Sequence, residues 1–293
     1  MWILGCGYIG LKLAQAYREK GQHITAVTRS EVSRQALVAM GFAALARDLA
    51  RASLDDLDWA GQDLFHLAPP PAEGAEDGLT RHLVASFPRT GHPRRLVYVS
   101  TTGVYGDCGG EWVDESRPPA PVAGRSLRRW DAERTLMAWS QESGAELVIL
   151  RVAGIYGPGR LPLERIRQGL PLPREEEAPW SNRIHADDMV QACMAAMERG
   201  RAGGLYNVCD DQPSTMTDYF TRLADAAALP RPPQLPLTEI RGQVSAGMLS
   251  YLAESRRLSN WHLKEELGVH LLYPDLSSGL MACFQAGSHE EAE

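Results

Sequence analysis

The chain has 293 residues, enough for one large domain or two modest ones, and its 44% apolar and 23% charged residues are ordinary for a globular protein. The formal charge of −7 argues against a nucleic-acid-binding protein, which normally carries a basic balance or stripe. No stretch approaches the ~18–20 apolar residues of a membrane span, so we expect no membrane association. Five dispersed cysteines and an N-terminus without a basic leader predict a cytoplasmic protein with reduced thiols.

The first half of the chain alternates short apolar runs with segments of helical periodicity. The apolar runs are rich in Val, Ile, Leu and Phe and occupy 2–7, 23–28, 42–49, 63–68, 95–102 and 146–153. Apolar residues at helical spacing predict helices over 9–21, 30–41 and 125–144. Strands alternating with helices form right-handed crossovers around a buried parallel sheet. The predicted fold class is therefore α/β, a doubly wound parallel sheet with helices on both faces.

The second half is different in character. A turn rich in glycine and proline at 154–163 is followed by a polar stretch and by a predicted helix over 187–200. We expect a first domain over 1–154 and a smaller lobe over 155–286. Residues around 182–210 are expected to return to the first domain, and 287–293 to form a disordered tail.

A glycine-rich loop follows the first predicted strand. Gly5, Gly7 and Gly10 form a GxGxxG pattern that ends the strand and opens the first helix. The first glycine permits a tight turn, the second lets a pyrophosphate approach the backbone, and the third lets helix and strand pack closely. The helix N-terminus favours the anion. The pattern predicts a dinucleotide site in a Rossmann-type domain, and the alternative is a glycine turn without a ligand.

The end of the second strand bears on which dinucleotide is bound. A site for NAD usually has an acid about 20 residues after the glycines, to hold the ribose 2′-hydroxyl. Here the strand ends in Thr28, Arg29 and Ser30, and Glu31 comes one position later than expected. An arginine at this place can pair with the 2′-phosphate of NADP. We therefore predict NADP in preference to NAD, and the alternative is an ordinary exposed arginine.

A set of short motifs then resembles one family. "RLVYVSTTGVYGD" at 95–107 is a buried strand running into Ser/Thr and "VYGD", and in order along the chain stand "DL" at 48–49, "HLAPP" at 66–70, "RVAGIYGPGR" at 151–160, "NRIHADD" at 182–188 and "YNVCDDQP" at 206–213. The chain in these motifs resembles the extended short-chain dehydrogenase/reductases of the NAD-dependent epimerase/dehydratase group. The resemblance implies a Rossmann domain that binds NAD(P) and a smaller C-terminal lobe that binds substrate.

The resemblance also implies roles for residues at matching positions. Thr101 falls at the position of the catalytic Ser/Thr, where its hydroxyl would bond a substrate oxygen; the alternative is a strand-end threonine that satisfies the backbone. The positions implied to contact the cofactor are Gly5, Cys6, Gly7, Tyr8, Ile9, Gly10, Arg29, Ser30, Asp48, Leu49, Leu67, Ala68, Pro69, Arg129, Val152 and Gly154.

The chain departs from the family at the catalytic helix. The family has a Tyr-x-x-x-Lys pair there, in which the tyrosine supplies the proton and the lysine lowers its pKa and holds the nicotinamide ribose. Alignment on Glu133 puts Arg125 at the tyrosine position and Arg129 at the lysine position, and no tyrosine lies between Tyr105 and Tyr156. Arginine stays protonated near neutrality, so Arg125 cannot do the chemistry of the tyrosine. The sequence thus predicts an atypical member of the group.

Several other residues are candidates for the substrate site. Tyr105, Tyr156 and His185 are candidate proton donors, although for the two tyrosines packing of the ring in its turn is the favoured interpretation. The positions expected to contact substrate are Thr102, Tyr156, Arg160, Arg183 and His185. Asp187 and Asp188 begin a helix and fit capping better than metal binding, so no metal is expected.

These patterns together predict an NADP(H)-dependent oxidoreductase or epimerase-like enzyme that acts on a small molecule, with a sugar nucleotide as one substrate class. The missing tyrosine keeps a second hypothesis open, a non-catalytic NAD(P)-binding sensor or scaffold protein. Members of the family often dimerise through two helices of the Rossmann domain, so a homodimer through the helix at 125–143 is a further expectation.

Overall fold

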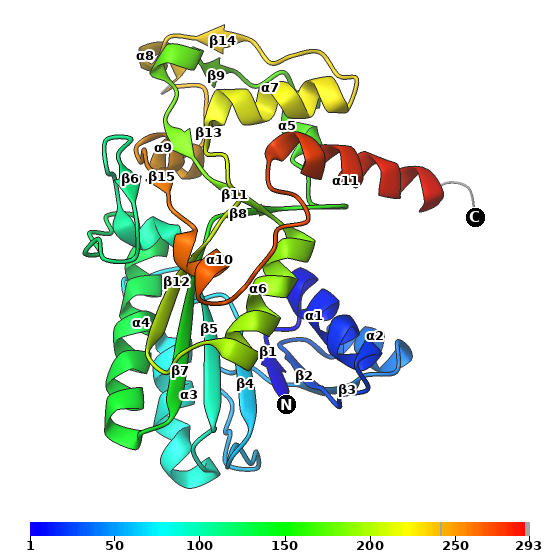
Figure 1. Cartoon of the computed structure of the whole chain (residues 1–293), viewed down its shortest axis with the longest axis vertical. Helices are drawn as coiled ribbons and strands as arrows, with labels where there is room; N and C mark the ends of the chain where they lie inside the picture. Colours follow the sequence, from blue (N-terminus) through cyan, green and yellow to red (C-terminus); the bar gives the residue numbers. More distant parts are fainter. Residues whose placement is uncertain (241, 291–293) are drawn as a thin grey trace.

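A computed structural model describes residues 1–240 and 242–290, with the side chains of 286–290 left out. Two lobes lie one above the other in Figure 1, a larger one built on a parallel sheet and a smaller one formed mainly by the second half of the chain.

The larger lobe is a single parallel sheet of seven strands in the order β12-β7-β5-β4-β1-β2-β3. Its strands are β1 (Trp2–Leu4), β2 (Thr25–Thr28), β3 (Ala43–Ala46), β4 (Asp63–His66), β5 (Arg95–Thr101), β7 (Glu146–Val152) and β12 (Gly204–Val208). The chain winds outward from β1 in one direction through β2 and β3, and in the other through β4, β5, β7 and β12. The strand order therefore reverses at β1, where open α/β sheets bind ligands at the carboxyl ends of their strands.

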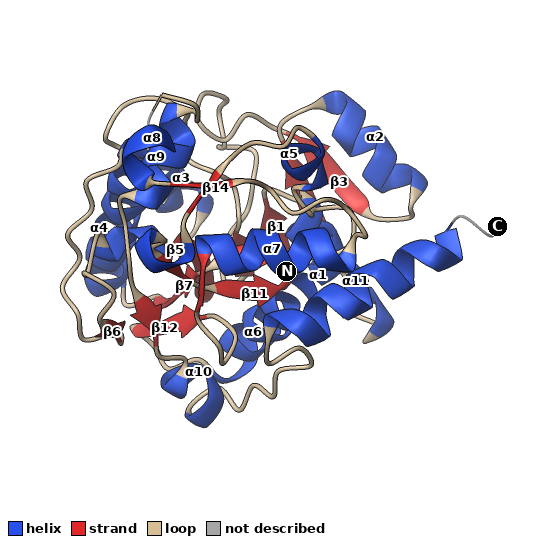
Figure 2. Cartoon of the chain, turned by 90° about the horizontal axis from the view of Figure 1, so that it is seen from above, coloured by secondary structure: helices blue, strands red, loops and turns tan. Residues whose placement is uncertain are grey.

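Helices cover both faces of this sheet, as Figure 2 shows from above. They are α1 (Tyr8–Glu19), α2 (Glu31–Ala39), α3 (Gly78–Thr90), α4 (Gly124–Ser143) and α6 (Ala186–Arg199). Apolar residues of α1, α2 and α6 share one buried cluster with the sheet, whereas those of α3 and α4 pack in a second cluster on the opposite face. The predicted doubly wound α/β class is confirmed, because each parallel crossover carries its helix onto a face of the sheet.

One helix of the sheet lobe was absent from the sequence prediction. Helix α3 begins after Asp77, whose carboxylate caps it by accepting from the amides of Leu79 and Thr80. Pro88 and the threonines within α3 weaken its helical signal. Burial of Leu83 and Phe87 against the sheet stabilises the helix despite that composition.

The smaller lobe combines short strands and helices. Its elements are β8 (Gly154–Tyr156), α5 (Leu163–Arg167), β9 (Leu172–Pro173), β10 (Trp180–Ser181), β11 (Arg183–His185), β13 (Ser214–Thr215), α7 (Met216–Ala226), β14 (Gln234–Leu235), α8 (Leu237–Ile240), α9 (Ala246–Leu252) and α11 (Leu276–Glu290). Tyr219, Phe220 and Leu223 of α7 pack in its core with Leu276 and Leu280 of α11.

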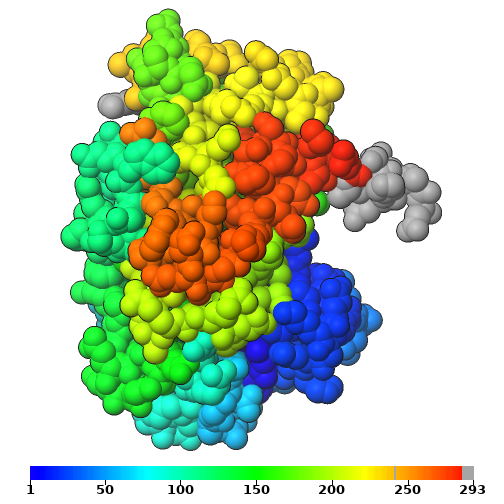
Figure 3. Space-filling view, viewed as in Figure 1, coloured from blue at the N-terminus to red at the C-terminus, as the bar shows by residue number. Residues whose placement is uncertain are grey.

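The chain crosses between the lobes more than once. The segment 182–210, expected to return to the first domain, contains α6 and β12, and β12 pairs with β7 at the sheet edge. The later helix α10 (Trp261–Glu265) and the turn after it place Leu263 and Leu267 in the cluster of the sheet lobe. Figure 3 shows this C-terminal segment, in orange, lying over the outer surface of the sheet lobe. Helix α11 continues to Glu290, so residues 287–290 of the expected tail are helical, and 291–293 lie outside the described residues.

A buried ion pair joins helix α4 to the middle of the sheet. Arg151 of β7 donates from Nη2 to Oε2 of Glu133 at 2.8 Å, and the side chains are 3% and 0% exposed. The Ser100 hydroxyl donates to the same carboxylate, and the Arg151 guanidinium lies 4.7 Å from the centre of the Tyr105 ring. The pair therefore fixes α4 against the strand ends that carry the candidate site.

Three further properties concern the cysteines, the length of the helices and the possible metal ligands. All five cysteines are free and buried. Among the helices of the described ranges, none is long and apolar enough to cross a membrane. Within the same ranges, no group of three or more His, Cys, Asp or Glu side chains could hold a metal ion.

Candidate functional site

The glycine loop lies at the carboxyl end of β1, at the switch point of the sheet. Gly5 has φ +87°, and a Cβ there would lie 2.5 Å from the Cα and N atoms of Ala68. A Cβ on Gly10 would lie 3.1 Å from the carbonyl oxygen of Gly5, so helix and strand approach closely there. Gly7, at the N-terminus of α1, is exposed and has no atom within 4 Å of an added Cβ. The loop thus leaves open space in front of free helix amides, which fits a pyrophosphate group.

The ends of β2 and β3 border this loop. Arg29 is exposed and makes no ion pair with any described residue, whereas Ser30 caps α2 by accepting from the amide of Ser33 at 3.2 Å. Glu31 is occupied by the guanidinium of Arg34, whose Nε lies 2.8 Å from Oε1. The cation at the end of β2 is therefore unneutralised, as a 2′-phosphate site requires.

The remaining predicted cofactor residues surround the same strand ends. Asp48 accepts the amide of Ala50 at 3.0 Å, and Leu49 is buried in the core under α3. After β4, the amide of Leu67 donates to the carbonyl oxygen of Leu4, Ala68 packs on Gly5, and Pro69 is exposed. In the glycine loop, Cys6 is buried, Ile9 packs on the core and the Tyr8 hydroxyl donates to the carbonyl oxygen of Pro158 at 3.0 Å.

Thr101 ends β5 and begins a short 3-10 helix, η1 (Thr102–Tyr105). Its hydroxyl oxygen accepts from the amide of Gly103 at 3.2 Å, which is the backbone interaction considered as the alternative. Thr101 nevertheless lines the large cavity described below, together with Thr102 and Gly103. The hydroxyl therefore keeps a hydrogen atom that can be donated to a ligand oxygen in the cavity.

The arginines of α4 have different environments. Arg129 points to the ends of β4 and β5, where Nη1 donates to the carbonyl oxygen of Val99 at 2.9 Å and to the Tyr98 hydroxyl at 3.2 Å. Arg125 reaches the cavity and stacks on Tyr251 with its guanidinium carbon 3.9 Å from the ring centre. Arg128 is buried and donates to the carbonyl oxygen of Gly74. Arg128 does not pair with Asp131, whose carboxylate pairs with Arg81 and Arg134 instead.

A cavity of about 420 Å³ lies between the two lobes, next to these strand ends. Its floor comes from η1, α4 and the turn after β7. Its other walls come from β10, β11, α7, α9, the segment after α9 and Pro162, which precedes α5. The lining residues are Thr101, Thr102, Gly103, Arg125, Val152, Ala153, Gly154, Pro162, Trp180, Ser181, Asn182, Arg183, Met216, Tyr219, Phe220, Met248, Tyr251, Glu254 and Arg256.

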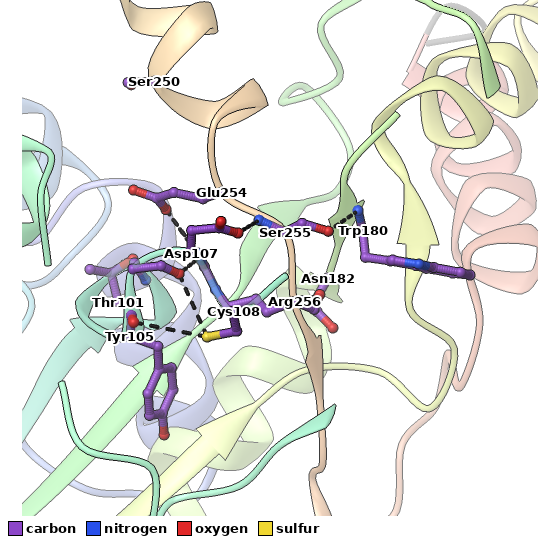
Figure 4. Close-up of polar contacts among 12 residues, drawn as sticks. Thr101, Tyr105, Asp107, Cys108, Trp180, Asn182, Ser250, Glu254, Ser255 and Arg256 are labelled. Carbon is purple, nitrogen blue, oxygen red and sulfur yellow. Dashed lines mark hydrogen bonds and ion pairs between the residues drawn. The ribbon is translucent and has the colours of Figure 1, made fainter. Parts of the chain in front are cut away.

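The segment after α9 contributes Glu254 and Arg256 to the cavity wall, and Figure 4 shows Ser255 of this segment bonded to Asp107 and Trp180. Ser255 donates its amide to the Asp107 carboxylate at 2.9 Å and accepts the amides of Cys108 and Gly110 at its carbonyl oxygen. Its hydroxyl accepts the amide of Trp180 at 3.0 Å. These bonds attach a segment 150 residues away in sequence to the loop that follows Thr101, so the cavity wall is held in place by both lobes.

The structure keeps the candidate proton donors away from the cavity. The Tyr105 hydroxyl donates to Oδ1 of Asn207 at 2.7 Å within the sheet lobe, and burial raises the pKa of this tyrosine to about 12. Tyr156 is 1% exposed and its hydroxyl lies close to Gly279 of α11. Neither tyrosine lines the cavity, so the packing interpretation fits both.

His185 and Arg160, two expected substrate contacts, also lie elsewhere. His185 is 1% exposed and caps α6, because Nδ1 accepts the amide of Asp187 at 3.2 Å while Nε2 faces the Cys283 thiol. Burial lowers the pKa of His185 and favours the neutral ring. Arg160 is exposed and stacks on Tyr8 of the glycine loop, 5.2 Å from its ring centre, rather than lining the cavity.

Some cavity residues carry no sequence signal of their own. Tyr219 and Phe220 lie on an amphipathic helix where they look like core residues, and both are indeed nearly buried. Glu254 and Arg256 stand in an unremarkable polar stretch near the C-terminal end. Only the attachment of residues 254–258 to the loop after Thr101 shows that they belong to the site.

A glycine loop at the switch point of a doubly wound sheet, open before a helix N-terminus, defines a dinucleotide-binding α/β protein. The sequence model of the NAD dependent epimerase/dehydratase family matches residues 75–209. The chain belongs to this NAD-dependent epimerase/dehydratase family, whose members include epimerases, dehydratases and reductases.

Similar proteins cover nearly the whole chain. The protein YeeZ of Escherichia coli K12 is 28% identical over 288 residues, which span 93% of this chain and 96% of YeeZ. A solved structure of a conserved protein of unknown function from Silicibacter pomeroyi DSS is 32% identical, with a TM-score of 0.81 over 98% of both chains. The UDP-glucose 4-epimerase of Thermotoga maritima, solved with UDP-glucose, is 19% identical with a TM-score of 0.79 over 100% of both chains and so shares the fold.

Proposed function

We propose that this protein is an NADP(H)-dependent oxidoreductase or epimerase-like enzyme that acts on a small molecule in the cavity between its lobes. The observation that carries the proposal is that the open glycine loop lies at the carboxyl ends of β1 and β4, while the cavity lies at those of the neighbouring strands β5 and β7. The solved relative bound to UDP-glucose makes a sugar nucleotide the first substrate class to test.

The residues of the chain fit a nicotinamide dinucleotide. Gly7 and the α1 N-terminus would hold the pyrophosphate, Arg29 the adenosine ribose phosphate, and Arg129 the end of the cofactor near β5. When bound, the nicotinamide supplies or accepts the hydride. Thr101 would donate its hydroxyl hydrogen to the reacting oxygen of the substrate and so fix the orientation of that oxygen.

The group that supplies the proton would differ from the tyrosine of the family. Arg125 stands at the expected tyrosine position and stays protonated, so it can stabilise a developing negative charge but cannot exchange a proton. Among the described residues that line the cavity, the side chains that can exchange a proton are those of Tyr219, Tyr251 and Glu254. The proton of the reaction would therefore come from one of these groups or from water.

Calorimetric titration with NADPH and NADH tests the cofactor assignment. We expect NADPH to bind more tightly, and Arg29→Ala to remove about 10- to 100-fold of that preference, because a hydrogen bond to a charged group is worth about 1.5–3 kcal/mol. Arg34→Ala is the matched control, since Arg34 is an exposed arginine already paired with Glu31. An unchanged NADPH/NADH ratio in Arg29→Ala would show that Arg29 does not bind the 2′-phosphate.

The second candidate is an NAD(P)-binding sensor, favoured by the position of Tyr105 and Tyr156 outside the cavity. Stopped-flow absorbance in the nicotinamide band separates the two hypotheses. An enzyme oxidises NADPH with at least one carbonyl compound, including 4-keto sugar nucleotides. Tight NADPH binding without oxidation across a broad carbonyl panel would favour the sensor.

A further inference from the structure

The charges that line the cavity are unbalanced. Three arginines line it, and among the described lining residues the only carboxylate is that of Glu254. This carboxylate lies 3.1 Å from Nη1 of Arg256 and 3.5 Å from Nη2 of Arg125. Glu254 is thus shared by two arginines, and Arg183 is left without a carboxylate partner among the described residues.

Arg183 is held by neutral groups. Its Nη1 donates to the carbonyl oxygen of Asn182 at 2.8 Å, Nη2 lies 3.9 Å from Sδ of Met216, and the guanidinium carbon lies 4.3 Å from the ring centre of Tyr219. These contacts orient the planar guanidinium and leave other N–H donors free. A partly buried cation without a counter-charge is costly, and an anionic ligand would offset that cost.

One acidic residue nearby does not neutralise Arg183. Asp210 acts on Arg183 electrostatically but forms no ion pair with it among the described contacts. Asp210 is 2% exposed, and burial raises its pKa to about 8, so most of this carboxyl is protonated near neutral pH. The positive charge of Arg183 therefore remains available to a ligand.

The strand register places Arg183 close to Thr101. Thr101 pairs with Val152 of β7, and two residues further along the chain Gly154 of β8 pairs with Arg183 of β11. Each pairing spans one strand spacing of about 5 Å. Both side chains line the same cavity, so one small molecule can contact both at once.

We propose that Arg183 binds an anionic group of the substrate, a phosphate or a carboxylate, while Thr101 holds the reacting oxygen of the same molecule. The inference rests on the proposed function, since it assumes that the cavity is the substrate site. It adds that the substrate is an anion that can reach both side chains within the cavity. The rings of Tyr219, Phe220 and Trp180 provide apolar surface beside this group.

Calorimetry on the NADPH-loaded protein tests the inference with four probes. UDP-glucose represents phosphates and benzoate represents carboxylates, and glucose and benzyl alcohol are their uncharged counterparts. We expect at least one anion to bind and both neutral probes to bind at least tenfold more weakly. The anion that binds identifies which of the two chemistries the site prefers.

Substitutions then locate the binding group. Arg183→Gln is expected to lower the affinity for the anion about 10- to 100-fold, while the affinity for NADPH stays unchanged. Arg183→Lys keeps the charge but loses the planar fork, so we expect a smaller loss of about 3- to 10-fold, and this variant carries the test if Arg183→Gln does not fold. Arg222→Gln, an exposed arginine of α7 paired with Asp218, is the matched control and should bind as the wild type does.

Two results would overturn the inference. One is that the NADPH-loaded wild type binds neither anion, and the other is that the foldable Arg183 variants bind the anion with wild-type affinity. Failure of the wild type to bind NADPH or NADH is a separate result, which would refute the proposed function itself.

Discussion

The ion pair between Glu133 and Arg151 offers a strong test of how the site is supported. We predict that Arg151→Met, which leaves the Glu133 carboxylate without its cation, lowers the free energy of unfolding by about 3–5 kcal/mol. Both side chains are almost fully buried, and Arg151 supplies two of the nitrogen donors to this carboxylate. In the variant the Ser100 hydroxyl would be the remaining described donor to a charge that water cannot reach.

The predicted loss in the free energy of unfolding is large because the pair is buried, not merely because it is charged. A solvent-exposed pair is screened and contributes little, whereas a buried charge that loses its partner keeps its full desolvation cost. For a chain of this size, about 3–5 kcal/mol corresponds to a decrease in melting temperature of roughly 5–8 °C. The double variant Glu133→Leu/Arg151→Met removes both charges, and we expect it to recover part of the loss.

Urea denaturation followed by circular dichroism and by tryptophan fluorescence gives the free energy, provided that the two transitions coincide. Glu31→Gln, which removes the exposed pair with Arg34, is the control and should leave the melting temperature unchanged. A loss below about 1 kcal/mol in Arg151→Met, or a double variant as unstable as the sum of the single variants, would refute the reasoning.

Four further predictions concern the site and its surroundings. Gly5→Ala should destabilise the fold by about 1–3 kcal/mol, because its φ is +87° and its Cβ would collide with the backbone of Ala68. Gly7→Ala should melt as the wild type does yet bind NADPH at least tenfold more weakly in a titration; equal binding would place the pyrophosphate elsewhere. Asp210 holds its proton in the folded state up to about pH 8, so the stability contributed by this group is present below pH 4 and is lost as the pH rises through 8. The stability of Asp210→Asn relative to wild type should therefore rise with pH between about 4 and 8, by at most ~1.4 kcal/mol per pH unit, and a flat difference in melts across this range would contradict the assigned pKa. Thr101→Val should lower NADPH oxidation about 100-fold once a substrate is known while Thr101→Ser retains most activity, and equal rates for both variants would remove Thr101 from the reaction.

The predictable part of the fold came from local patterns. The six apolar runs and the helices between them are properties of short segments, and the parallel crossovers follow from their alternation. Helix α3 escaped prediction because Pro88 and the threonines weaken its helical propensity, and burial against the sheet overrides that weakness.

In the site, too, the sequence predicts some residues and leaves the roles of others open. The spacing of Gly5, Gly7 and Gly10 predicts the cofactor loop because the three glycines stand within six residues of chain, but the backbone that Gly5 approaches belongs to Ala68 and is seen only in the fold. The sequence could not show that His185 caps α6 rather than facing the cavity, since a histidine before a helix is compatible with both roles.

The sequence by itself determined the sheet, the glycine loop and the family, because all of these are written in contiguous motifs; that Arg125 stands in place of the catalytic tyrosine is a prediction from the same motifs. The tertiary structure alone decided which side chains share the cavity. Arg125, Arg183 and Glu254 come from distant parts of the chain, and only folding brings their charges together. The excess positive charge that points to an anionic substrate arises because Glu254 is shared by two arginines, and pairing across such distances leaves no periodicity or spacing in the sequence.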